Sequence, residues 1–487
     1  MKQKNKYILL SILFILVVIP VFGYLNYLPI RLWDESRIAI NAMEMYWNNN
    51  FIVTHYMGKA DLWNTKPPML IWLQVTSMHL FGLNEFALRL PSAIANFFIL
   101  VLIIIFSEKY LKNIWIAPLW VLVFISSQGL VNIHSSRTAD YDTLLSFVNF
   151  VYLISFYLYI ENKNKRYLYY TFVFITLSFL TKGIAGLMFL PSLLLYILYK
   201  KEFFNILKNK HFYIGILMFL FIGIGYYLIR ELNSSGYIKA VFSNEVGGRF
   251  MQVTENHNES FWFYFNDLIN NRFINLYLFI PFGIIIAFFT KNKSIKQFSI
   301  FLLFSIIPFL LIISIAKTKL AWYNMPTRSL LSFFVAFSLY SISKFIYDYK
   351  ILKNKKILSI SIIILFIVIV LKKPYTGIIK NTYKPVEYAW DINKFAISYF
   401  LRDAVNNKID LNNTAYLNTE YNPQNLFYIK ILQKKGVNIK VININDIKYV
   451  DKIIIPKSTD LKIIEGKYLL SPILEKYNIT LYNISEK

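Results

Sequence analysis

Between Arg31 and Pro68 the sequence reads RLWDESRIAINAMEMYWNNNFIVTHYMGKADLWNTKPP. This is the first long polar segment after a hydrophobic start, in which residues 1–6 are basic and residues 7 to about 24 are apolar. An apolar stretch of this length behind a basic amino end, with no convincing small-residue cleavage site, predicts a retained transmembrane helix with its amino end inside. The quoted segment is then the first outer loop, and the topology of the rest of the chain follows from this start.

The composition is that of a membrane protein that crosses the bilayer many times. The chain has 487 residues, of which 56% are hydrophobic, 18% aromatic and 16% charged, whereas soluble domains are about 25% charged. The formal net charge of +25 comes from short basic clusters between apolar runs, which is the positive-inside pattern, so no nucleic-acid partner is expected. Cysteine is absent, which excludes disulfides, thiolate metal sites and a cysteine nucleophile.

The apolar segments predict an α-helical polytopic membrane protein with about eleven transmembrane helices. They lie at about residues 7–24, 86–110, 114–131, 143–160, 167–180, 184–199, 212–229, 273–289, 298–316, 324–346 and 357–371. The loops assigned inside are short and lysine-rich, and the loops assigned outside hold most of the carboxylates. We therefore expect a multi-pass protein of the cytoplasmic (inner) membrane, with its functional loops and its carboxy-terminal part on the periplasmic or extracellular side.

The last part of the chain has a different character. Four β-prone runs (Thr414–Leu417, Asn438–Ile442, Lys452–Ile455 and Ile479–Asn483) alternate with two amphipathic stretches (Asp391–Val405 and Pro423–Lys435). None of them is long enough to span a bilayer. The predicted organisation is a transmembrane domain with an outer-loop active site at residues 1–371 and a small extracytoplasmic α/β domain at residues 372–487.

The first outer loop holds the strongest candidates for chemistry. Asp34 and Glu35 lie just beyond a transmembrane helix, where a carboxylate can deprotonate an acceptor hydroxyl or orient an acceptor phosphate. The alternative is that Asp34 is the amino-terminal cap of the helical run Glu35–Tyr46. Lys66 precedes two prolines on a rigid, extended segment and can neutralise a phosphate, or it can snorkel from the helix that follows. The residues alone leave both alternatives open.

Three later outer segments also carry charged groups. They read RTADYD at 137–142, NEVGGRF at 244–250 with a histidine at 257, and KTKLAWY at 317–323. Helix capping is the alternative for the two aspartates of the first segment. The lysines of the third segment depart from the positive-inside trend and suit an anionic headgroup.

The order of these segments resembles the outer loops of the GT-C glycosyltransferases that use polyprenyl-phosphate sugars, a group that includes protein O-mannosyltransferases and the lipid A aminoarabinose transferase. The acidic pair and arginine at 34–37 resemble the catalytic signature of the family. Residues 64–68 resemble its Glu-Lys-Pro segment, with Thr65 in place of a glutamate that takes part in metal binding, and residues 317–323 resemble its Thr-Lys-Leu-Pro-Trp-Tyr turn. The likeness covers roughly residues 7–346.

The resemblance implies roles for individual residues. Asp34 and Glu35 correspond to the catalytic carboxylates. The residues implied in substrate or phosphate binding are Arg37, Lys66, Arg137, Asp140, Asp142, Arg249, Lys317, Lys319 and Tyr323. A divalent metal ion is the one candidate cofactor, with Glu245 and His257 as its candidate ligands.

The predicted function is the transfer, with inversion, of a sugar or amino sugar from a polyprenyl-phosphate donor to an extracytoplasmic acceptor, which is a lipid A-like glycolipid, a protein or a cell-envelope glycan. One alternative is a flippase or transporter of lipid-linked sugars, which places its charges within the spans. The other is a surface-polysaccharide polymerase or ligase, whose main functional loop is expected late in the chain. The concentration of charged residues in outer turns, above all in the first loop, favours the transferase.

Overall fold

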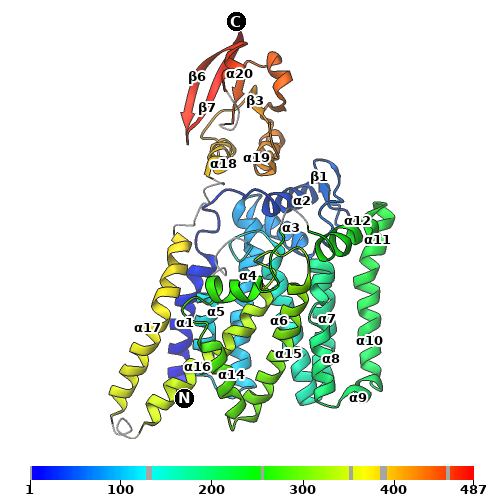
Figure 1. Cartoon of the computed structure of the whole chain (residues 1–487). Helices are drawn as coiled ribbons and strands as arrows, with labels where there is room; N and C mark the ends of the chain where they lie inside the picture. The colour runs from blue at the N-terminus through cyan, green and yellow to red at the C-terminus, as the bar shows by residue number, and fades with distance from the viewer. Residues whose placement is uncertain (1–2, 128–133, 254–256, 350–354, 384–391, 457–460) are drawn as a thin grey trace.

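The computed structural model describes residues 3–127, 134–253, 257–349, 355–383, 392–456 and 461–487. Long helices run side by side in the lower layer, short helices cross their upper ends, and a small α/β unit stands above them (Figure 1). α2 (Asp34–Asn48) and α3 (Met69–Phe81) belong to the middle layer. The first outer loop therefore lies between the helical bundle and the α/β unit.

In the described part of the chain, eight helices are long and apolar enough to cross a membrane. They are α1 (Gln3–Phe22), α4 (Glu85–Lys109), α6 (Tyr141–Asn162), α7 with its 3-10 extension (Lys165–Leu187), the α10–α11 unit (Lys210–Asn233), α15 (Lys293–Ile315), α16 (Met325–Asp348) and α17 (Lys356–Tyr383). The other three predicted spans coincide with shorter apolar helices, α5 (Ile116–Ser126), α8 (Leu190–Tyr199) and α14 (Phe279–Phe289). The polytopic helical fold is confirmed, and the count of eleven spans stays a prediction.

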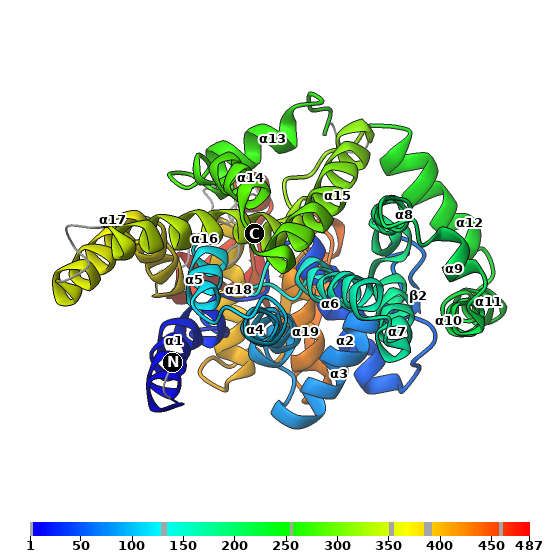
Figure 2. The same ribbon diagram turned by 90° about the horizontal axis from the view of Figure 1, so that it is seen from below.

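Several helices begin at asparagine caps in the basic turns between spans. Asn164, Asn209 and Asn292 precede α7, α10 and α15, and each side chain accepts a hydrogen bond from a backbone N–H of the first turn at 3.0 to 3.2 Å. Such caps satisfy N–H groups that the helix itself leaves without partners. The turns next to α9 (Phe203–Leu207) and between α14 and α15 both lie at the lower end of the bundle (Figure 1), where the sequence places the inner loops. Seen from below, α9 lies at one side of the bundle, away from α14 (Figure 2).

The bundle has an aromatic core at the level of α5, α15 and α16. The ring of Trp120 packs 5.9 Å from that of Phe298 and 5.0 Å from that of Phe333, and its indole N–H donates to the carbonyl of Ser329 at 2.9 Å. α14 approaches α16 closely, because a Cβ on Gly283 would lie 2.0 Å from the carbonyl oxygen of Phe334. Small residues permit such close helix contacts in membranes.

Short elements complete the middle layer and surround the site. They are β1 (His55–Tyr56), β2 (Lys59–Ala60), α12 (Tyr237–Val241), η3 (Phe242–Phe250), α13 (Phe263–Asp267) and η4 (Leu268–Arg272). An isolated bridge pairs Asn258 with Thr318, so the loop after η3 lies against the turn before α16. Two of the predicted outer segments, distant in sequence, are thus neighbours in the structure.

The carboxy-terminal unit is an α/β fold with one five-stranded sheet of order β4-β3-β5-β7-β6. Its elements are α18 (Ile392–Val405), β3 (Thr414–Leu417), α19 (Pro423–Lys434), β4 (Ile439–Ile442), η5 (Ile444–Tyr449), β5 (Lys452–Ile454), α20 (Leu461–Glu465), β6 (Tyr468–Lys476) and β7 (Ile479–Glu486). β4, β3 and β5 are parallel, and β7 and β6 are antiparallel. The four predicted β runs are all strands, whereas the sequence analysis did not include β6. Its Pro472 marks a register shift, and proline in a strand is tolerated at a sheet edge such as this one.

The junction between the two parts differs from the prediction. α17 continues through Leu371 to Tyr383, so the predicted boundary at 371/372 falls within a helix. α19 then packs on α2, and α18 packs on α19. Phe400 and Phe427 share one apolar core with Met43. The α/β unit is therefore in direct contact with the helix that carries the first acidic pair.

Candidate active site

α2 begins at Asp34 itself, which excludes the capping alternative for this residue. Trp33 occupies the N-cap position with φ 71° and ψ −123°, and no side chain caps the helix. The carboxylate of Asp34 is 33% exposed and lies 4.0 Å from Nδ1 of His134. Asp34 thus stands at the start of a helix with its carboxylate open to an adjoining space.

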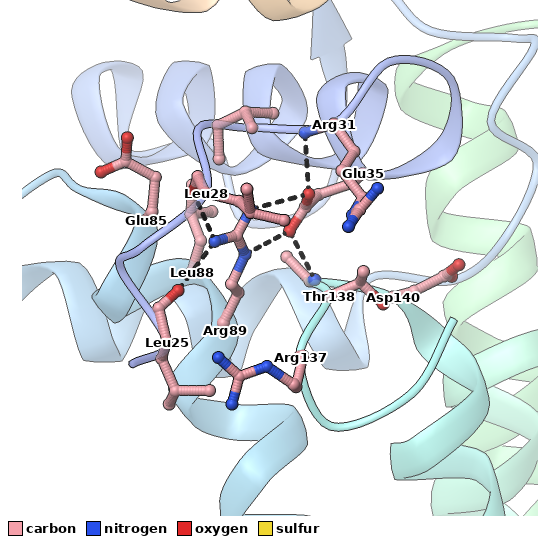
Figure 3. A network of polar contacts seen from close by, with 12 residues as sticks. Leu25, Leu28, Arg31, Glu35, Glu85, Leu88, Arg89, Arg137, Thr138 and Asp140 are labelled. Atoms are coloured by element: carbon pink, nitrogen blue, oxygen red, sulfur yellow. Dashed lines mark hydrogen bonds and ion pairs between the residues drawn. The ribbon is translucent and has the colours of Figure 1, made fainter. Parts of the chain in front are cut away.

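Glu35, the second predicted catalytic carboxylate, has a different environment (Figure 3). It accepts two hydrogen bonds from Arg89 at 2.7 and 3.0 Å, one from the backbone N–H of Arg31 at 2.8 Å and one from that of Ala139 at 3.0 Å. Arg89 donates further bonds to the carbonyls of Leu25, Leu28 and Pro29. Burial raises the pKa of Glu35, but the charge and hydrogen bonds of Arg89 outweigh it and hold that pKa below its usual value.

This network joins α4 to the first and second outer loops. Glu35 is 3% exposed and does not line the cavity described below. A carboxylate with four hydrogen bonds and a guanidinium partner is fully satisfied and has no free lone pair directed at a substrate. These contacts suit a residue that positions the loops around it, and the catalytic role of Glu35 stays a prediction.

A small pocket that opens to solvent lies beside Asp34, and its empty space, open solvent included, is about 330 Å³. It is lined by Asp34, Arg37, Ile38, Trp63, Asn64, Lys66, Asp140, Tyr141, Asp142, Lys182, Arg249 and Trp322. These residues come from four outer segments and from the end of α7. Six of the predicted site residues meet here: Asp34, Arg37, Lys66, Asp140, Asp142 and Arg249.

Besides Arg37, three cations border this cavity. Lys182 pairs with Asp142 at 2.6 Å, Arg249 donates to the hydroxyl of Tyr323 at 2.9 Å, and the ammonium of Lys66 lies 5.8 Å from the ring centre of Tyr141. Burial and the nearby charge of Arg249 lower the pKa of Lys66, although Glu245 and Asp34 act in the opposite direction. Positive charge that is only partly balanced suits an anionic group in the cavity.

Arg37 borders the same cavity but is already paired. It donates to both carboxylate oxygens of Asp61, at 2.9 and 2.7 Å. Its guanidinium lies 3.7 Å from the ring centre of Tyr56 and 4.9 Å from that of Trp63. The charge of Arg37 is thus largely neutralised, so it offers hydrogen bonding more than net charge.

His134 is the residue that the sequence analysis missed. Its ring stacks on Trp322 at 3.5 Å, its Nδ1 contacts the carboxylate of Asp140, and Asp34 lies on its other side. Burial lowers the pKa of His134, but Asp140 and Asp34 outweigh it and raise that pKa above its ordinary value. The only signal in the sequence was its place in the second outer turn, since nothing in the spacing of that turn relates it to Asp34.

The same group can hold a divalent ion. One ligand atom each from Asp34, His134 and Asp140 lie within 4.8 Å of one another, and this is the one group of three or more His, Asp or Glu residues within such a distance in the described ranges. Two carboxylates and an imidazole are a donor set that Zn²⁺ accepts. The predicted ligands Glu245 and His257 are not members of it.

Glu245 and His257 have other contacts. The hydroxyl of Thr65 donates to Glu245 at 3.0 Å, so the threonine that replaces the family's glutamate is directly bonded to a predicted metal ligand. Burial raises the pKa of Glu245, but Lys66 and Arg249 outweigh it and lower that pKa. The backbone carbonyl of His257 accepts from the N–H of Lys319 at 3.2 Å. Their metal role stays a prediction.

The remaining predicted residues lie beside the cavity or support it. Asp140 lines it and also caps α6, accepting from the N–H of Tyr141 at 2.6 Å, as the capping alternative held. Arg137 donates to the carbonyls of Gly23 and Tyr24, at 2.5 and 2.7 Å, and so connects the second outer turn to the end of α1. Arg137 is not among the lining residues, and burial lowers its pKa to about 10.

The turn at residues 317–323 contributes fewer side chains to the cavity than the sequence predicted. Lys317 is exposed, and the ammonium of Lys319 donates to the carbonyl of Ala316 at 2.8 Å. Neither lysine lines the cavity. Tyr323 reaches it through its bond to Arg249, and the neighbouring Trp322 lines it directly.

Comparisons with known proteins show which families and folds the chain resembles. The family model described as dolichyl-phosphate-mannose-protein mannosyltransferase matches residues 65–227. A protein of Aquifex aeolicus that is itself uncharacterized is 28% identical over 362 residues, which is 74% of this chain and 68% of that protein. The undecaprenyl phosphate-alpha-4-amino-4-deoxy-L-arabinose arabinosyl transferase of Wigglesworthia glossinidia brevipalpis is 28% identical over 404 residues, which is 79% of this chain and 68% of that enzyme.

Solved structures share the fold over nearly the whole chain. The crystal structure of ArnT from Cupriavidus metallidurans bound to undecaprenyl phosphate aligns with a TM-score of 0.71 and 14% identity, covering 99% of this chain and 98% of that one. The archaeal oligosaccharyltransferase AglB from Archaeoglobus fulgidus aligns with a TM-score of 0.52 and 12% identity, covering 99% of this chain and 75% of that one. Both the transmembrane bundle and the carboxy-terminal unit thus have counterparts in the first of these structures.

Proposed function

We propose a reaction for this chain, which is a GT-C glycosyltransferase that takes its sugar from a polyprenyl-phosphate-linked donor. The donor phosphate binds to the cations of the cavity, and the sugar passes to an extracytoplasmic acceptor beside Asp34. One bond forms, between the acceptor oxygen and the anomeric carbon, and the bond from that carbon to the phosphate oxygen breaks with its electron pair going to the phosphate. A single displacement of this kind inverts the anomeric centre.

Lys66, Lys182 and Arg249 would offset the negative charge that grows on the departing phosphate. Their ammonium and guanidinium groups border one cavity and are fixed before the reaction by Asp142, Tyr323 and the surrounding loops. Preorganised charge of this kind is commonly the largest contribution to catalysis in a site shielded from water. No proton needs to reach the leaving group, because a phosphate leaves as an anion.

Asp34 would act on the acceptor. Of the three carboxylates that line the cavity, Asp34 has the weakest partner, because Asp142 is paired with Lys182 and Asp140 with His134. The neighbouring Glu35 is paired with Arg89. An ionised carboxylate in the position of Asp34 can accept the proton of an acceptor hydroxyl as the new bond forms. If the acceptor is already anionic, Asp34 orients it through a bridging hydrogen bond or ion.

Asp34, His134 and Asp140 are the residues that would hold a divalent ion, and such an ion would supply positive charge next to the attacking oxygen. Asp140 would keep His134 oriented toward Asp34 whether or not an ion is bound. We further propose that the upper end of the bundle in Figure 1 faces the periplasm or cell exterior, and that the chain divides into a transmembrane domain and a carboxy-terminal domain docked on it.

The observation that carries the proposal is the open carboxylate of Asp34 in a cavity with three cations. To test it, purified protein in detergent is given a polyprenyl-phosphate-linked sugar pool with or without membranes that contain acceptor, and free polyprenyl phosphate is measured. We expect release that depends on the membranes and that falls about 10³-fold in Asp34→Asn. Asp348→Asn, an exposed aspartate at the end of α16, is the matched control and should release lipid phosphate at the wild-type rate.

Two results would contradict the proposal. Equal release by Asp34→Asn and wild type would remove Asp34 from the reaction. Transfer that retains the anomeric configuration, read from the product by NMR, would exclude the single displacement.

A further inference from the structure

Trp33, directly before Asp34, has a backbone conformation that tryptophan rarely adopts. Its φ of 71° and ψ of −123° lie in a region that glycine occupies readily and that other residues avoid. The conformation is held because the carbonyl of Trp33 accepts bonds from the N–H of Arg37 at 3.1 Å and from the hydroxyl of Ser36 at 2.8 Å. Strain of this kind is concentrated at functional sites, where the surrounding structure maintains it.

The strained turn leaves the indole of Trp33 52% exposed, where it meets a residue of the carboxy-terminal domain. The ring of Tyr421 lies 5.5 Å from that of Trp33 at an interplanar angle of 35°, and Tyr421 is itself 40% exposed. Tyr421 lies between β3 and α19, and α19 is fixed to the outer loops by the hydroxyl of Tyr428. That hydroxyl donates to Glu85 at 2.6 Å and accepts from the N–H of Ile30 at 2.9 Å.

Tyr421 also contacts the lining of the cavity. Its hydroxyl lies near enough to the side chains of Arg37 and Tyr56 to raise the pKa of both groups. Arg37 lines the cavity together with Trp63, which is 43% exposed. Trp33, Tyr56, Trp63 and Tyr421 are thus grouped around Arg37 at one edge of the cavity, where Trp63 is the lining residue among them, and we call this group the aromatic rim.

The aromatic rim is electrostatically separate from the cations that would bind phosphate. The charged groups that most affect Lys66 are Arg249, Glu245, Asp34 and Lys182. Those that most affect Arg37 are Asp61 and Tyr421. The only cation of the rim is neutralised by Asp61, so the rim does not select for an anion.

We propose that the aromatic rim is the acceptor subsite and that it binds a saccharide ring, with Tyr421 of the carboxy-terminal domain as a specificity-determining residue. A sugar ring has an apolar C–H face that packs on exposed aromatic rings and a hydroxyl edge that needs hydrogen-bond partners. The rings of Trp33 and Trp63 are both exposed, and among the residues that the structure describes neither indole N–H donates a hydrogen bond, so both are available as donors to hydroxyls. This inference rests on the proposed function for the direction of transfer, since it puts the acceptor on the rim side of Asp34.

A binding experiment tests the inference without requiring turnover. Oligosaccharide released from envelope glycolipid, intact glycolipid in detergent and a serine- and threonine-containing peptide are each titrated against the protein while tryptophan fluorescence is recorded. We expect saturable quenching by the oligosaccharide and the glycolipid, in wild type and in Asp34→Asn alike. Tyr421→Ala should weaken the apparent Kd by roughly two- to tenfold, the loss of one aromatic contact, whereas Tyr477→Ala, a tyrosine of the same domain that is 42% exposed, should not.

Trp33→Gly provides a second, independent measurement. Glycine accepts the backbone conformation without strain, so this variant should melt at the wild-type temperature or above it, while saccharide binding falls by a similar factor. A residue with only a structural role would show the reverse, with lower stability and unchanged binding. Steady-state kinetics should show the acceptor KM raised and the donor KM unchanged in both variants.

The outcomes are distinguishable from those for the reaction itself. Failure of wild type to bind either saccharide, or binding of the peptide alone, would overturn the acceptor subsite even if lipid phosphate is still released. Binding of the glycolipid but not of the free oligosaccharide would show that the lipid part carries the affinity, which also overturns it. Saccharide binding without any release of lipid phosphate would contradict the proposed reaction and leave the subsite in place.

Discussion

Asp34 and Glu35 are neighbours in the first turn of α2, yet their surroundings are opposite. The Asp34 carboxylate is 33% exposed, with His134 at 4.0 Å. The Glu35 carboxylate is 3% exposed and is bound by Arg89 and two backbone N–H groups. Successive residues of a helix point about 100° apart, so one faces the cavity and the other faces the protein.

The difference shows how the first outer loop divides its work. The Glu35 network holds the segment before α2, the second outer turn and α4 in one arrangement (Figure 3). Because the backbone around it is fixed, Asp34 can remain open without becoming mobile. Buried support of this kind is what keeps a reactive group within a fraction of an ångström of its working position.

The largest effect, on stability, is expected from Arg89→Met, which removes the ion-pair partner of the buried Glu35. It leaves the Glu35 charge and three backbone carbonyls without their partner. Removal of one member of a buried ion pair costs about 3–5 kcal/mol of unfolding free energy, so we expect a strongly lowered melting temperature in detergent. The double variant Glu35→Gln with Arg89→Met should regain part of the loss, because no unpaired charge remains.

Arg166→Met, at an exposed arginine of the basic inner turn, is the control and should melt like wild type. If Arg89→Met were as stable as this control, the Glu35 network would not be what positions Asp34.

A smaller effect, on donor binding, is expected from Lys66→Met. Loss of a charge-assisted contact to phosphate corresponds to about 1.5–3 kcal/mol, or roughly a 10- to 100-fold rise in donor KM. Burial and Arg249 lower the pKa of Lys66, so its ammonium loses its proton at a lower pH than an ordinary lysine. The donor KM of wild type should therefore rise toward alkaline pH, and Lys66→Arg should remove that rise because a guanidinium stays charged.

Lys59→Met, an exposed lysine of the same outer loop, serves as the control for Lys66. A pH profile of Lys66→Arg identical to that of wild type would show that another group titrates, and would place the phosphate elsewhere in the cavity.

The smallest effect, on turnover, is expected from removal of a metal ion beside the open carboxylate of Asp34. If an ion joins Asp34, His134 and Asp140, chelation should lower turnover about tenfold, and Zn²⁺ or Mn²⁺ should restore it. His134→Gln should start from the lower rate and show no further response to the chelator. Unchanged turnover of chelated wild type would mean that no ion is needed between Asp34, His134 and Asp140 for the reaction.

Local features of the molecule could be predicted from the sequence. The helical bundle, the four β runs and the position of the acidic turns at one end of the bundle follow from apolar length, alternation and lysine distribution, all of which act over short distances. Asp34, Lys66 and Arg249 were placed in one site because the resemblance supplied the long-range contact that the chain itself does not show.

Features that depend on tertiary contacts were missed or misplaced. Glu35 was predicted to be catalytic together with Asp34. Its partner Arg89 lies 54 residues further along the chain, and no residue near Glu35 in the sequence indicates that pairing. His134 and Tyr421 gained their meaning only from Trp322 and Trp33, which folding brings to them. No residue of the carboxy-terminal domain was predicted to belong to the site, although the helices of this domain place Tyr421 beside Arg37.

The contact of Tyr428 with Glu85 and Ile30 has a consequence for biogenesis. The ribosome synthesises α1, α2 and α4 early, whereas it synthesises α19 only after the membrane helix α17. The segment that leads into Asp34 is therefore secured by a residue synthesised nearly four hundred positions later (398 for the contact with Ile30). The enzyme acquires its finished outer surface at the end of translation, so an interrupted chain inserts into the membrane without a complete site.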